Sequence, residues 1–230
     1  MHGGWGTGSN LAEQSGLDAA ARTHGFAVVY PNGSWRSWNA GNCCGRAASS
    51  GVDDVGFISA LKDKLAGESC IDGSRVYGTG FSNGAMLANR IACERPGVFR
   101  AIAPVAGGPM IDSCETNDPV PALLVVGRDD ERIPWKGGEF DGTHRPSIAD
   151  QVRVLARRNQ CGDEERSVLK RGGASCEQRS GCRRGDVVWC VIDGVGHQWP
   201  GGQTLLPRLL GRNSNDYDAA NEILKFFKAN

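Results

Sequence analysis

Arg75-Val-Tyr-Gly-Thr-Gly-Phe-Ser82-Asn-Gly-Ala-Met86 is the stretch that most strongly indicates the fold. It opens with a β-branched and an aromatic residue after Arg75, which favours a strand. Met86, Leu87 and Ile91 then give the following segment the apolar side of a helix. Between the two lies Gly80-Phe-Ser-Asn-Gly84, which matches the G-x-S-x-G pattern of a nucleophile elbow. The stretch therefore predicts a strand, a sharp turn with serine at its tip, and a helix.

Steric crowding explains why glycine is needed at two positions of this turn. Side chains at Gly80 and Gly84 would collide with the strand and helix that close around the serine. The turn would lift the Ser82 hydroxyl above the edge of the sheet and direct the Asn83 N–H at the group that Ser82 attacks. An ordinary Gly/Ser turn is the alternative, because the sequence has 33 Gly among 230 residues. The strand and helix signals on either side favour the elbow.

Length and charge narrow the class of protein. A chain of 230 residues suits one α/β domain, residues 1–230, with a large core. Lys and Arg together number 26, as do Asp and Glu, so the basic excess of a nucleic-acid-binding surface is missing. No run of 18 apolar residues predicts a membrane span. We therefore expect neither a nucleic-acid partner nor a membrane-spanning segment.

Strand and helix signals alternate along the chain. The predicted strands are continuous apolar runs, which is typical of a mostly parallel sheet covered by helices on both faces. Residues 162–186 lack these signals and are predicted to be a disulfide-stapled excursion from the core. The expected strands are 26–30, 75–80, 101–105, 122–126 and 187–192, and the expected helices are 53–65, 82–93, 148–158 and 218–228.

Nine cysteines indicate an oxidising compartment, because none of their spacings suggests a zinc site. Adjacent cysteines are poorly placed to bond each other, so we expect Cys43 and Cys44 each to pair elsewhere. A disulfide could staple the Gly/Arg/Ser-rich stretch that holds three of them. An odd number leaves at least one unpaired thiol. The nine are Cys43, Cys44, Cys70, Cys93, Cys114, Cys161, Cys176, Cys182 and Cys190.

A serine nucleophile needs a base, and two histidines follow Ser82 in the sequence. His197 comes just after the predicted strand 187–192, and open α/β sheets place their sites in loops at the carboxyl ends of strands. Its flanking glycines allow the imidazole to approach another loop. His144 has no strand directly before it. We therefore predict that His197 is the base, with a loop histidine bonded to backbone as the alternative.

The carboxylate that orients the base should follow the predicted strand 122–126. Gly127-Arg-Asp-Asp-Glu131 places three acids there. A charged surface turn would have the same composition. Physical reasoning on the sequence leaves Asp129 and Asp130 equally possible.

The segment His2-Gly-Gly-Trp-Gly-Thr-Gly8 is similar to the oxyanion loop of esterases, which supplies an N–H donor. Trp5, Trp38 and Trp199 each lie beside a site motif. They could line an aromatic cleft that suits a feruloyl ring, an aliphatic acyl chain or the face of a sugar. Tryptophan is also a common core residue, so a structural role is the alternative for each.

Four motifs in this order resemble the polyhydroxybutyrate depolymerase/feruloyl esterase group of secreted esterases. The resemblance covers nearly the whole chain, from His2 to the terminal helix. The motifs are Trp38-Asn-Ala-Gly-Asn-Cys-Cys-Gly45, Val52-Asp-Asp-Val-Gly-Phe57, Arg75-Val-Tyr-Gly-Thr-Gly-Phe-Ser-Asn-Gly-Ala-Met86 and Gly196-His-Gln-Trp-Pro-Gly201.

This resemblance implies an α/β-hydrolase fold with a Ser–Asp–His triad, no cofactor and no metal. The family pattern Gly-Thr-x-Asp aligns with Gly127-Arg-Asp-Asp130 and selects Asp130 as the acid. The oxyanion donors would be the N–H of Asn83 and one near Gly4 or Trp5. In this fold a central strand feeds the His-Gly loop, but only Met1 precedes the loop here. We therefore expect a sheet truncated at its N-terminal strands.

The combined hypothesis is a secreted or periplasmic carboxylic-ester hydrolase that works through a covalent acyl-enzyme. Ser82, His197 and Asp130 would be its triad. Its substrates would be feruloyl or acetyl esters of plant cell-wall polysaccharide, short acyl esters, or a polyhydroxyalkanoate polyester. Two alternatives remain on the same scaffold: a non-catalytic binding module and a serine peptidase.

Overall fold

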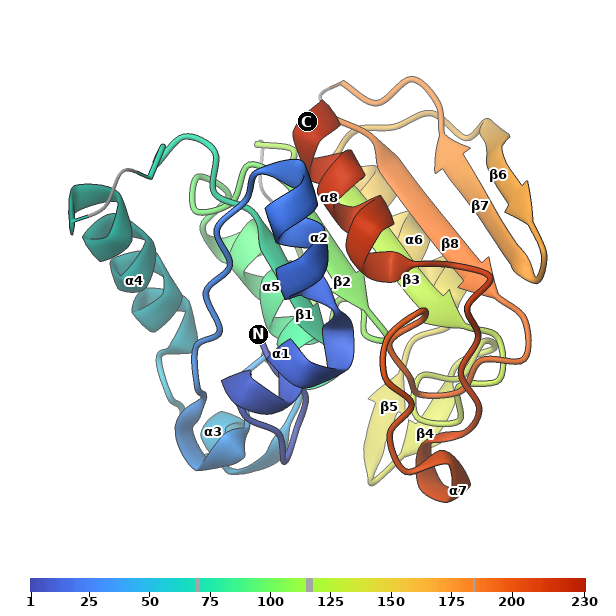
Figure 1. Cartoon of the computed structure of the whole chain (residues 1–230), viewed down its shortest axis with the longest axis horizontal. Coiled ribbons are helices and arrows are strands. Elements are labelled where there is room, and N and C mark those ends of the chain that lie inside the picture. The colour runs from blue at the N-terminus through green and yellow to red at the C-terminus, as the bar shows by residue number, and fades with distance from the viewer. Residues whose placement is uncertain (69–70, 115–117, 184) are drawn as a thin grey trace.

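A mixed sheet forms the centre of the molecule (Figure 1). The computed structural model describes residues 1–68, 71–114, 118–183 and 185–230. Within these ranges the strand order is β1-β2-β3-β8-β7-β6. Neighbours among the first four of these strands pair in parallel, and the pairs β8–β7 and β7–β6 are antiparallel. Their bounds are β1 Gly78–Phe81, β2 Ile102–Val105, β3 Ala122–Gly127, β8 Val187–Ile192, β7 Ala174–Arg179 and β6 Glu165–Arg171.

The central strands are apolar because both faces of the sheet are covered. Every residue of β2 and β3 is buried, as expected for parallel strands between two helical layers. The register places Ile102 opposite Ala122 and Val125 opposite Cys190. Ile102 and Ala122 belong to the core on one face of the sheet, and Val125 and Cys190 belong to the core on the other.

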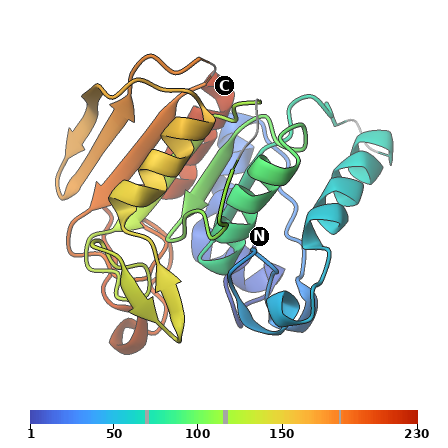
Figure 2. The same ribbon diagram turned by 180° about the vertical axis from the view of Figure 1, so that it is seen from behind.

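Helices cover the two faces, as Figures 1 and 2 show from opposite sides. On one face, apolar side chains of α1, α2 and α8 pack on the sheet, with Leu123 and Val125 in the same core. On the other, α4, α5 and α6 pack around Leu124 and Val126. This arrangement confirms the predicted α/β class. The bounds are α1 Gly8–Ser15, α2 Leu17–His24, α4 Asp54–Glu68, α5 Asn83–Glu94, α6 Ile148–Arg158 and α8 Ala219–Ala229.

The predicted strand at residues 26–30 is wrong. This segment is not a strand, and its residues alternate between half-buried and exposed. A cavity of about 670 Å³ lies between it and β1, lined by Val28 and Tyr30 on one side and by Val76 and Thr79 on the other. An apolar run becomes a strand only where a neighbour completes its hydrogen bonds, and none of the described strands pairs with it.

Met1, rather than residues 26–30, forms hydrogen bonds with the backbone of β1. Its amino group donates to the Thr79 carbonyl over 2.8 Å, and its carbonyl accepts from the Phe81 N–H over 3.1 Å. Two hydrogen bonds therefore fix the start of the His2–Gly8 loop against the strand that leads to Ser82.

The parallel strands end at the lower side of Figure 1, where shorter elements gather. A two-stranded hairpin, β4 Gly138–Phe140 and β5 Thr143–Arg145, projects there beside α7 Pro207–Leu210. The helix α3 Gly45–Ser49 and the 3₁₀ turn Ser34–Arg36 lie toward the same end. Open α/β sheets bind their ligands at this end.

One disulfide joins two neighbouring strands of the sheet, and others join segments outside the strands. Cys176 of β7 pairs with Cys190 of β8, Cys161 pairs with Cys182, and Cys93 pairs with Cys114. Residues 162–186, expected outside the core, contain β6 and β7, which extend the sheet at one edge.

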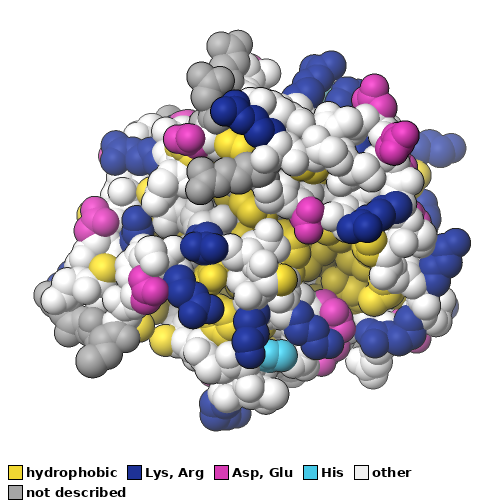
Figure 3. Space-filling model, turned by 90° about the horizontal axis from the view of Figure 1, so that it is seen from above, with side chains coloured by type: hydrophobic (Ala, Val, Ile, Leu, Met, Phe, Trp, Pro, Cys, Tyr) yellow, Lys and Arg dark blue, Asp and Glu magenta, His cyan; other side chains and the backbone are white. Residues whose placement is uncertain are grey.

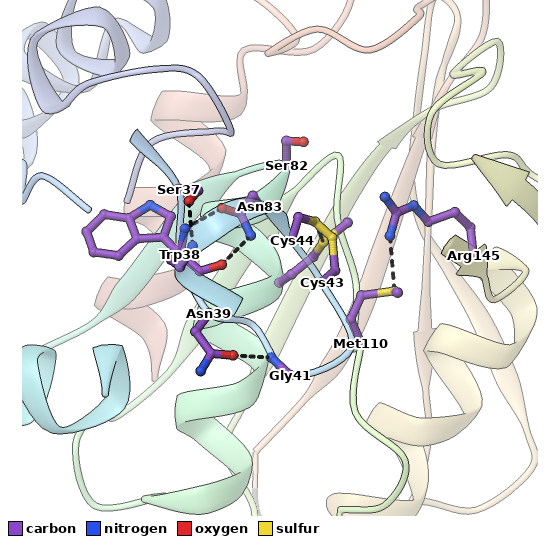
Figure 4. Close-up of a disulfide and its surroundings, with 12 residues drawn as sticks. Ser37, Trp38, Asn39, Gly41, Cys43, Cys44, Ser82, Asn83, Met110 and Arg145 are labelled. Atoms are coloured by element: carbon purple, nitrogen blue, oxygen red, sulfur yellow. Dashed lines mark hydrogen bonds between the residues drawn. A yellow bond between two sulfur atoms is a disulfide. The ribbon is translucent and has the colours of Figure 1, made fainter. Parts of the chain in front are cut away.

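The expectation that Cys43 and Cys44 pair elsewhere is wrong, because the structure pairs them with each other (Figure 4). The peptide bond between them is cis and their Cα atoms lie 3.1 Å apart, a separation that a cis bond allows and a trans bond does not. Cys70 lies outside the described residues.

The surface carries charges of both signs. On the face in Figure 3, Lys and Arg side chains stand among Asp and Glu side chains, in keeping with equal totals of 26. Among the described residues, no helix combines the length and hydropathy that a membrane crossing needs.

Candidate active site

Ser82 occupies a strained turn between β1 and α5. Its φ of 52° and ψ of −118° are rare for a residue with a side chain. The Ser82 N–H donates to the Val105 carbonyl of β2 over 2.9 Å, which fixes the turn to the sheet. A Cβ atom at Gly80 would lie 2.5 Å from the Gly84 carbonyl carbon, and one at Gly84 would lie 2.5 Å from the His2 carbonyl oxygen. The predicted steric need for glycine is confirmed at both positions, but the group that a side chain at Gly84 would meet is the backbone of Met1 and His2 rather than the strand or the helix.

Replacing Gly84 by alanine is expected to destabilise the protein by about 2 kcal/mol or more, because the new methyl group overlaps backbone oxygens that cannot move independently. Chemical denaturation measures the change. Gly67→Ala is the matched control, since the Cβ position at Gly67 in helix α4 is open and alanine there should add about 0.5–1 kcal/mol. Equal stability of Gly84→Ala and the wild-type protein would contradict this account of the turn.

Three side chains form a continuous hydrogen-bonded line at the carboxyl end of the sheet. The His197 Nε2 lies 2.8 Å from the Ser82 Oγ. The His197 Nδ1 lies 2.8 Å from the Asp130 Oδ2. Both the imidazole and the carboxylate are buried, with 5% and 3% of their residue surfaces exposed. The three residues come from three different loops, so only the folded sheet brings them together.

Backbone donors hold the Asp130 carboxylate in place. Its second oxygen, Oδ1, accepts the N–H groups of Arg132 and Ile133 over 2.8 and 2.9 Å. The neighbouring Asp129 is exposed. The structure therefore separates the two aspartates that sequence chemistry left open, because only Asp130 reaches the imidazole.

The loop that carries His197 packs closely against two neighbouring segments. The His197 N–H donates to the Leu210 carbonyl over 2.6 Å. A Cβ at Gly196 would lie 2.8 Å from the Gly211 Cα, and one at Gly127 would lie 2.5 Å from the Gly196 carbonyl oxygen. These glycines let the histidine loop pass against both the acid loop and the segment after α7. The sequence-based expectation of a close loop approach is met at Gly196.

Of the three predicted oxyanion donors, two have an N–H without a backbone partner among the described residues and one does not. Asn83 begins α5, so its N–H has no partner within the helix and points out of the helix N-terminus. The Gly4 N–H forms no hydrogen bond to a backbone carbonyl of the described residues. The Trp5 N–H, in contrast, donates to the Arg36 carbonyl over 2.8 Å. The prediction that Trp5 could supply an oxyanion donor is therefore wrong, since its N–H already donates to Arg36.

Trp38 is a structural clamp rather than a wall of the cleft. It has no exposed surface. Its backbone exchanges two hydrogen bonds with the Asn83 side-chain amide over 2.7 and 2.9 Å, and its indole donates to the His2 carbonyl over 2.9 Å. Figure 4 shows the paired amide and backbone directly below Ser82. Trp38 thus fixes both loops that flank the serine, and the prediction that it contacts substrate is corrected.

Trp199 is also fully buried. It belongs to the core beneath α1, α2 and α8 and does not line the cavity beside Ser82. The prediction that Trp199 lines the cleft is therefore wrong. Its large aromatic side chain is buried in the core, where its apolar surface stabilises the fold. Trp5 is the one of the three tryptophans that lines the cavity, and 84% of its surface is exposed.

A cavity of about 400 Å³ opens beside Ser82 and His197. Its walls come partly from segments that carried no sequence signal: the β4–β5 hairpin, the loop before α7, and α7 itself. The residues that these segments contribute are Phe140, Asp141, Arg145, Gln203, Leu205, Leu206 and Leu210. No periodicity or motif in the sequence identified them, since their place depends on how the loops fold over the sheet edge.

Comparison with known proteins places the chain in a family. The model of the family described as Esterase PHB depolymerase matches residues 1–132. "Putative esterase NocK" of Nocardia uniformis subsp. tsuyamanensis is 29% identical, with 98% of this chain and 72% of that protein covered. Feruloyl esterase B of Piromyces equi is 28% identical over 84% of this chain, which spans 36% of that protein.

The fold has solved counterparts. An acetyl xylan esterase from Aspergillus awamori superposes with a TM-score of 0.65 at 15% identity, covering 99% of this chain and 86% of that one. At this identity the likeness concerns the fold alone, and it confirms the predicted α/β-hydrolase architecture. Since the family model matches residues 1–132 of 230, more than half of the chain, this protein belongs to the esterase PHB depolymerase family of serine carboxylic-ester hydrolases.

Proposed function

We propose that residues 1–230 form one catalytic domain that hydrolyses carboxylic esters with Ser82 as nucleophile, His197 as general base and Asp130 as the orienting acid. The observation that carries the proposal is the pair of 2.8 Å contacts joining the three side chains at a strained turn. A structural serine needs neither the strain nor the buried imidazole.

The first step of the mechanism follows from the hydrogen-bonding capacities. An ionised Asp130 can only accept, so it keeps the imidazole proton on Nδ1 and leaves Nε2 free to accept from the Ser82 hydroxyl. As the Ser82 Oγ attacks the ester carbonyl, its proton passes to Nε2. Asp130 then stabilises the imidazolium, and its two backbone donors keep it aligned.

The negative charge that forms on the carbonyl oxygen would be held by the N–H of Asn83 and that of Gly4. Each such donor typically lowers the barrier by about 3–4 kcal/mol. The imidazolium returns its proton to the departing alcohol and leaves an acyl-enzyme on Ser82. Water, activated by the same imidazole, then releases the acid and restores the hydroxyl.

The substrate class rests on the relatives and on the cavity. Two curated relatives are feruloyl esterases, and the cavity offers apolar walls at Trp5 and Phe140 beside the serine. We propose aromatic and short acyl esters as substrates, including feruloyl esters of cell-wall polysaccharide, with polyhydroxyalkanoate as a second candidate. The four cysteine pairs favour an extracytoplasmic location.

A fluorophosphonate probe tests the nucleophile in the intact protein. We expect one probe per chain, with its phosphorus bonded to the Ser82 Oγ after loss of fluoride, as located by peptide mass spectrometry. Protein unfolded in denaturant should take up no probe, because labelling depends on the folded triad. A folded protein that stays unlabelled would instead support the non-catalytic binding module.

Two substrate comparisons complete the test. p-Nitrophenyl butyrate and its p-nitroanilide analogue separate an esterase from a serine peptidase, and we expect turnover of the ester alone. Methyl ferulate, acetylated xylan and hydroxybutyrate oligomers separate the ester classes. We expect methyl ferulate to be turned over fastest, and equally weak turnover of all three would contradict the aromatic preference.

A further inference from the structure

Arg145 ends the β4–β5 hairpin and lines the same cavity as Ser82 and His197. Only 6% of its residue surface is exposed. Figure 4 shows its guanidinium directed from the hairpin toward the loop of Cys43 and Cys44, on the side where Ser82 lies. A charged side chain is thus almost fully buried at the edge of the proposed catalytic cleft.

The guanidinium lacks the partners that a buried charge normally has. Its Nε is buried without a hydrogen bond, and its Nη1 has only the weak acceptor Met110 Sδ at 3.9 Å. No salt bridge to a carboxylate of the described residues is present at Arg145. Burial lowers the pKa of Arg145, and the charges of Asp141 and Glu139 oppose this only in part. Unpaired burial of a charge is unfavourable, so folding alone does not account for this arginine.

Other charged groups around the cavity do not neutralise Arg145. Asp141 is exposed, as is Glu13 on α1. Arg132 adds a second positive charge beside the cavity, and the centre of the Phe140 ring lies 5.3 Å from the Cζ of Arg132 and 5.9 Å from that of Arg145. The aromatic ring holds both cations without supplying a negative charge.

We propose that Arg145 is a specificity-determining residue that binds a carboxylate carried by the ester substrate beyond the bond that is cleaved. A carboxylate offers two oxygens to the planar guanidinium fork and removes the unpaired state of the buried charge. The substrates would be esters with a free acid group, such as half-esters of dicarboxylic acids, acid-terminated oligoesters or esters of uronate-bearing sugars. This inference rests on the proposed function of Ser82 and His197.

A matched pair of substrates isolates the carboxylate. p-Nitrophenyl hexanoate and the p-nitrophenyl half-ester of adipic acid share acyl length and leaving group, and differ in a terminal methyl or carboxylate. We expect the wild-type protein to prefer the adipate half-ester in kcat/KM, mostly through KM. A second pair, 4-carboxyphenyl and 4-carbamoylphenyl hexanoate, places the acid on the leaving group and shows from which side of the scissile bond Arg145 reads it.

Variants then assign the preference to one residue. In Arg145→Gln the ratio of adipate to hexanoate kcat/KM should fall about 10- to 100-fold, as for loss of a charge-assisted hydrogen bond. Arg145→Lys should retain part of the ratio because the charge remains. Arg166→Gln is the control for net charge, since Arg166 is exposed on β6, and it should leave the ratio within about twofold, as expected for a distant surface charge.

The outcomes separate this inference from the proposed function. Turnover of neither ester by wild-type protein would overturn the hydrolase proposal itself. Turnover of hexanoate without preference for either acid-bearing substrate would overturn the role of Arg145 alone. If the variants fail to fold, the wild-type protein still decides, because equal kcat/KM for each acid-bearing ester and its neutral partner would contradict the proposal.

Discussion

Ser82→Ala is expected to lower kcat for p-nitrophenyl butyrate by roughly 10⁵-fold or more, the loss typical of removing a nucleophile from an interdependent triad. The cause is local, because alanine removes the Oγ that lies 2.8 Å from the His197 Nε2 and leaves the rest of the cleft intact. Residual rate would come only from the oxyanion donors acting on water. The absorbance of the released p-nitrophenol, followed over minutes for the wild-type protein and over days for the variant, gives the ratio of the two kcat values.

Ser167→Ala provides the control for this prediction. Ser167 is exposed on β6 at the far edge of the sheet, so its removal should leave kcat unchanged within experimental spread. The melting temperature of Ser82→Ala should match or exceed that of the wild-type protein, because active-site residues are held for chemistry rather than stability. Near wild-type turnover by Ser82→Ala would show that another residue is the nucleophile.

Much of the fold and two of the site positions could be predicted because their signals are local. The apolar runs at 122–126 and 187–192 form strands because each is buried between two helical layers. Ser82 could be placed because it lies within the G-x-S-x-G pattern, in which a Cβ atom at Gly80 or Gly84 would overlap neighbouring backbone atoms. His197 followed because it lies just after such a strand, and parallel strands bring their carboxyl ends to one edge. The same argument left Asp129 and Asp130 open, and the family resemblance selected Asp130.

Other features depend on partners that are distant in the sequence. Residues 26–30 have strand composition, but no described strand pairs with them. β6 and β7 pair despite many charged residues, because an antiparallel edge needs only one apolar face. Trp38 and Trp199 lie beside site motifs in sequence, yet the direction of a side chain is set by tertiary packing, and both point into the core.

Arg145 is the clearest example of a residue with no sequence signal. Nothing in the composition of the hairpin distinguishes it from the exposed arginines of the chain. Its burial arises because β5 turns its last residue inward against Met110 and Phe140. A specificity residue of this kind can be recognised only once the hydrogen-bond partners of each buried charge have been counted.

Asp130→Asn is expected to lower kcat by roughly 10⁴-fold, although the substitution changes no atom positions in the carboxylate plane. An amide can donate to the His197 Nδ1, which would shift the imidazole proton to Nε2 and prevent that nitrogen from accepting from Ser82. The amide would also meet the two backbone N–H donors of Arg132 and Ile133, which fixes its oxygen on Oδ1 and its NH₂ toward the imidazole.

Asp129→Asn is the matched control, since it removes the same charge one residue earlier. Asp129 is exposed, and a surface charge screened by water should alter kcat by less than about threefold. The contrast therefore tests the geometry of the hydrogen bond at 2.8 Å rather than the charge of the loop. Equal losses in the two variants would mean that the loop acts through its overall charge, and a larger loss at Asp129 would assign the orienting acid to the other aspartate.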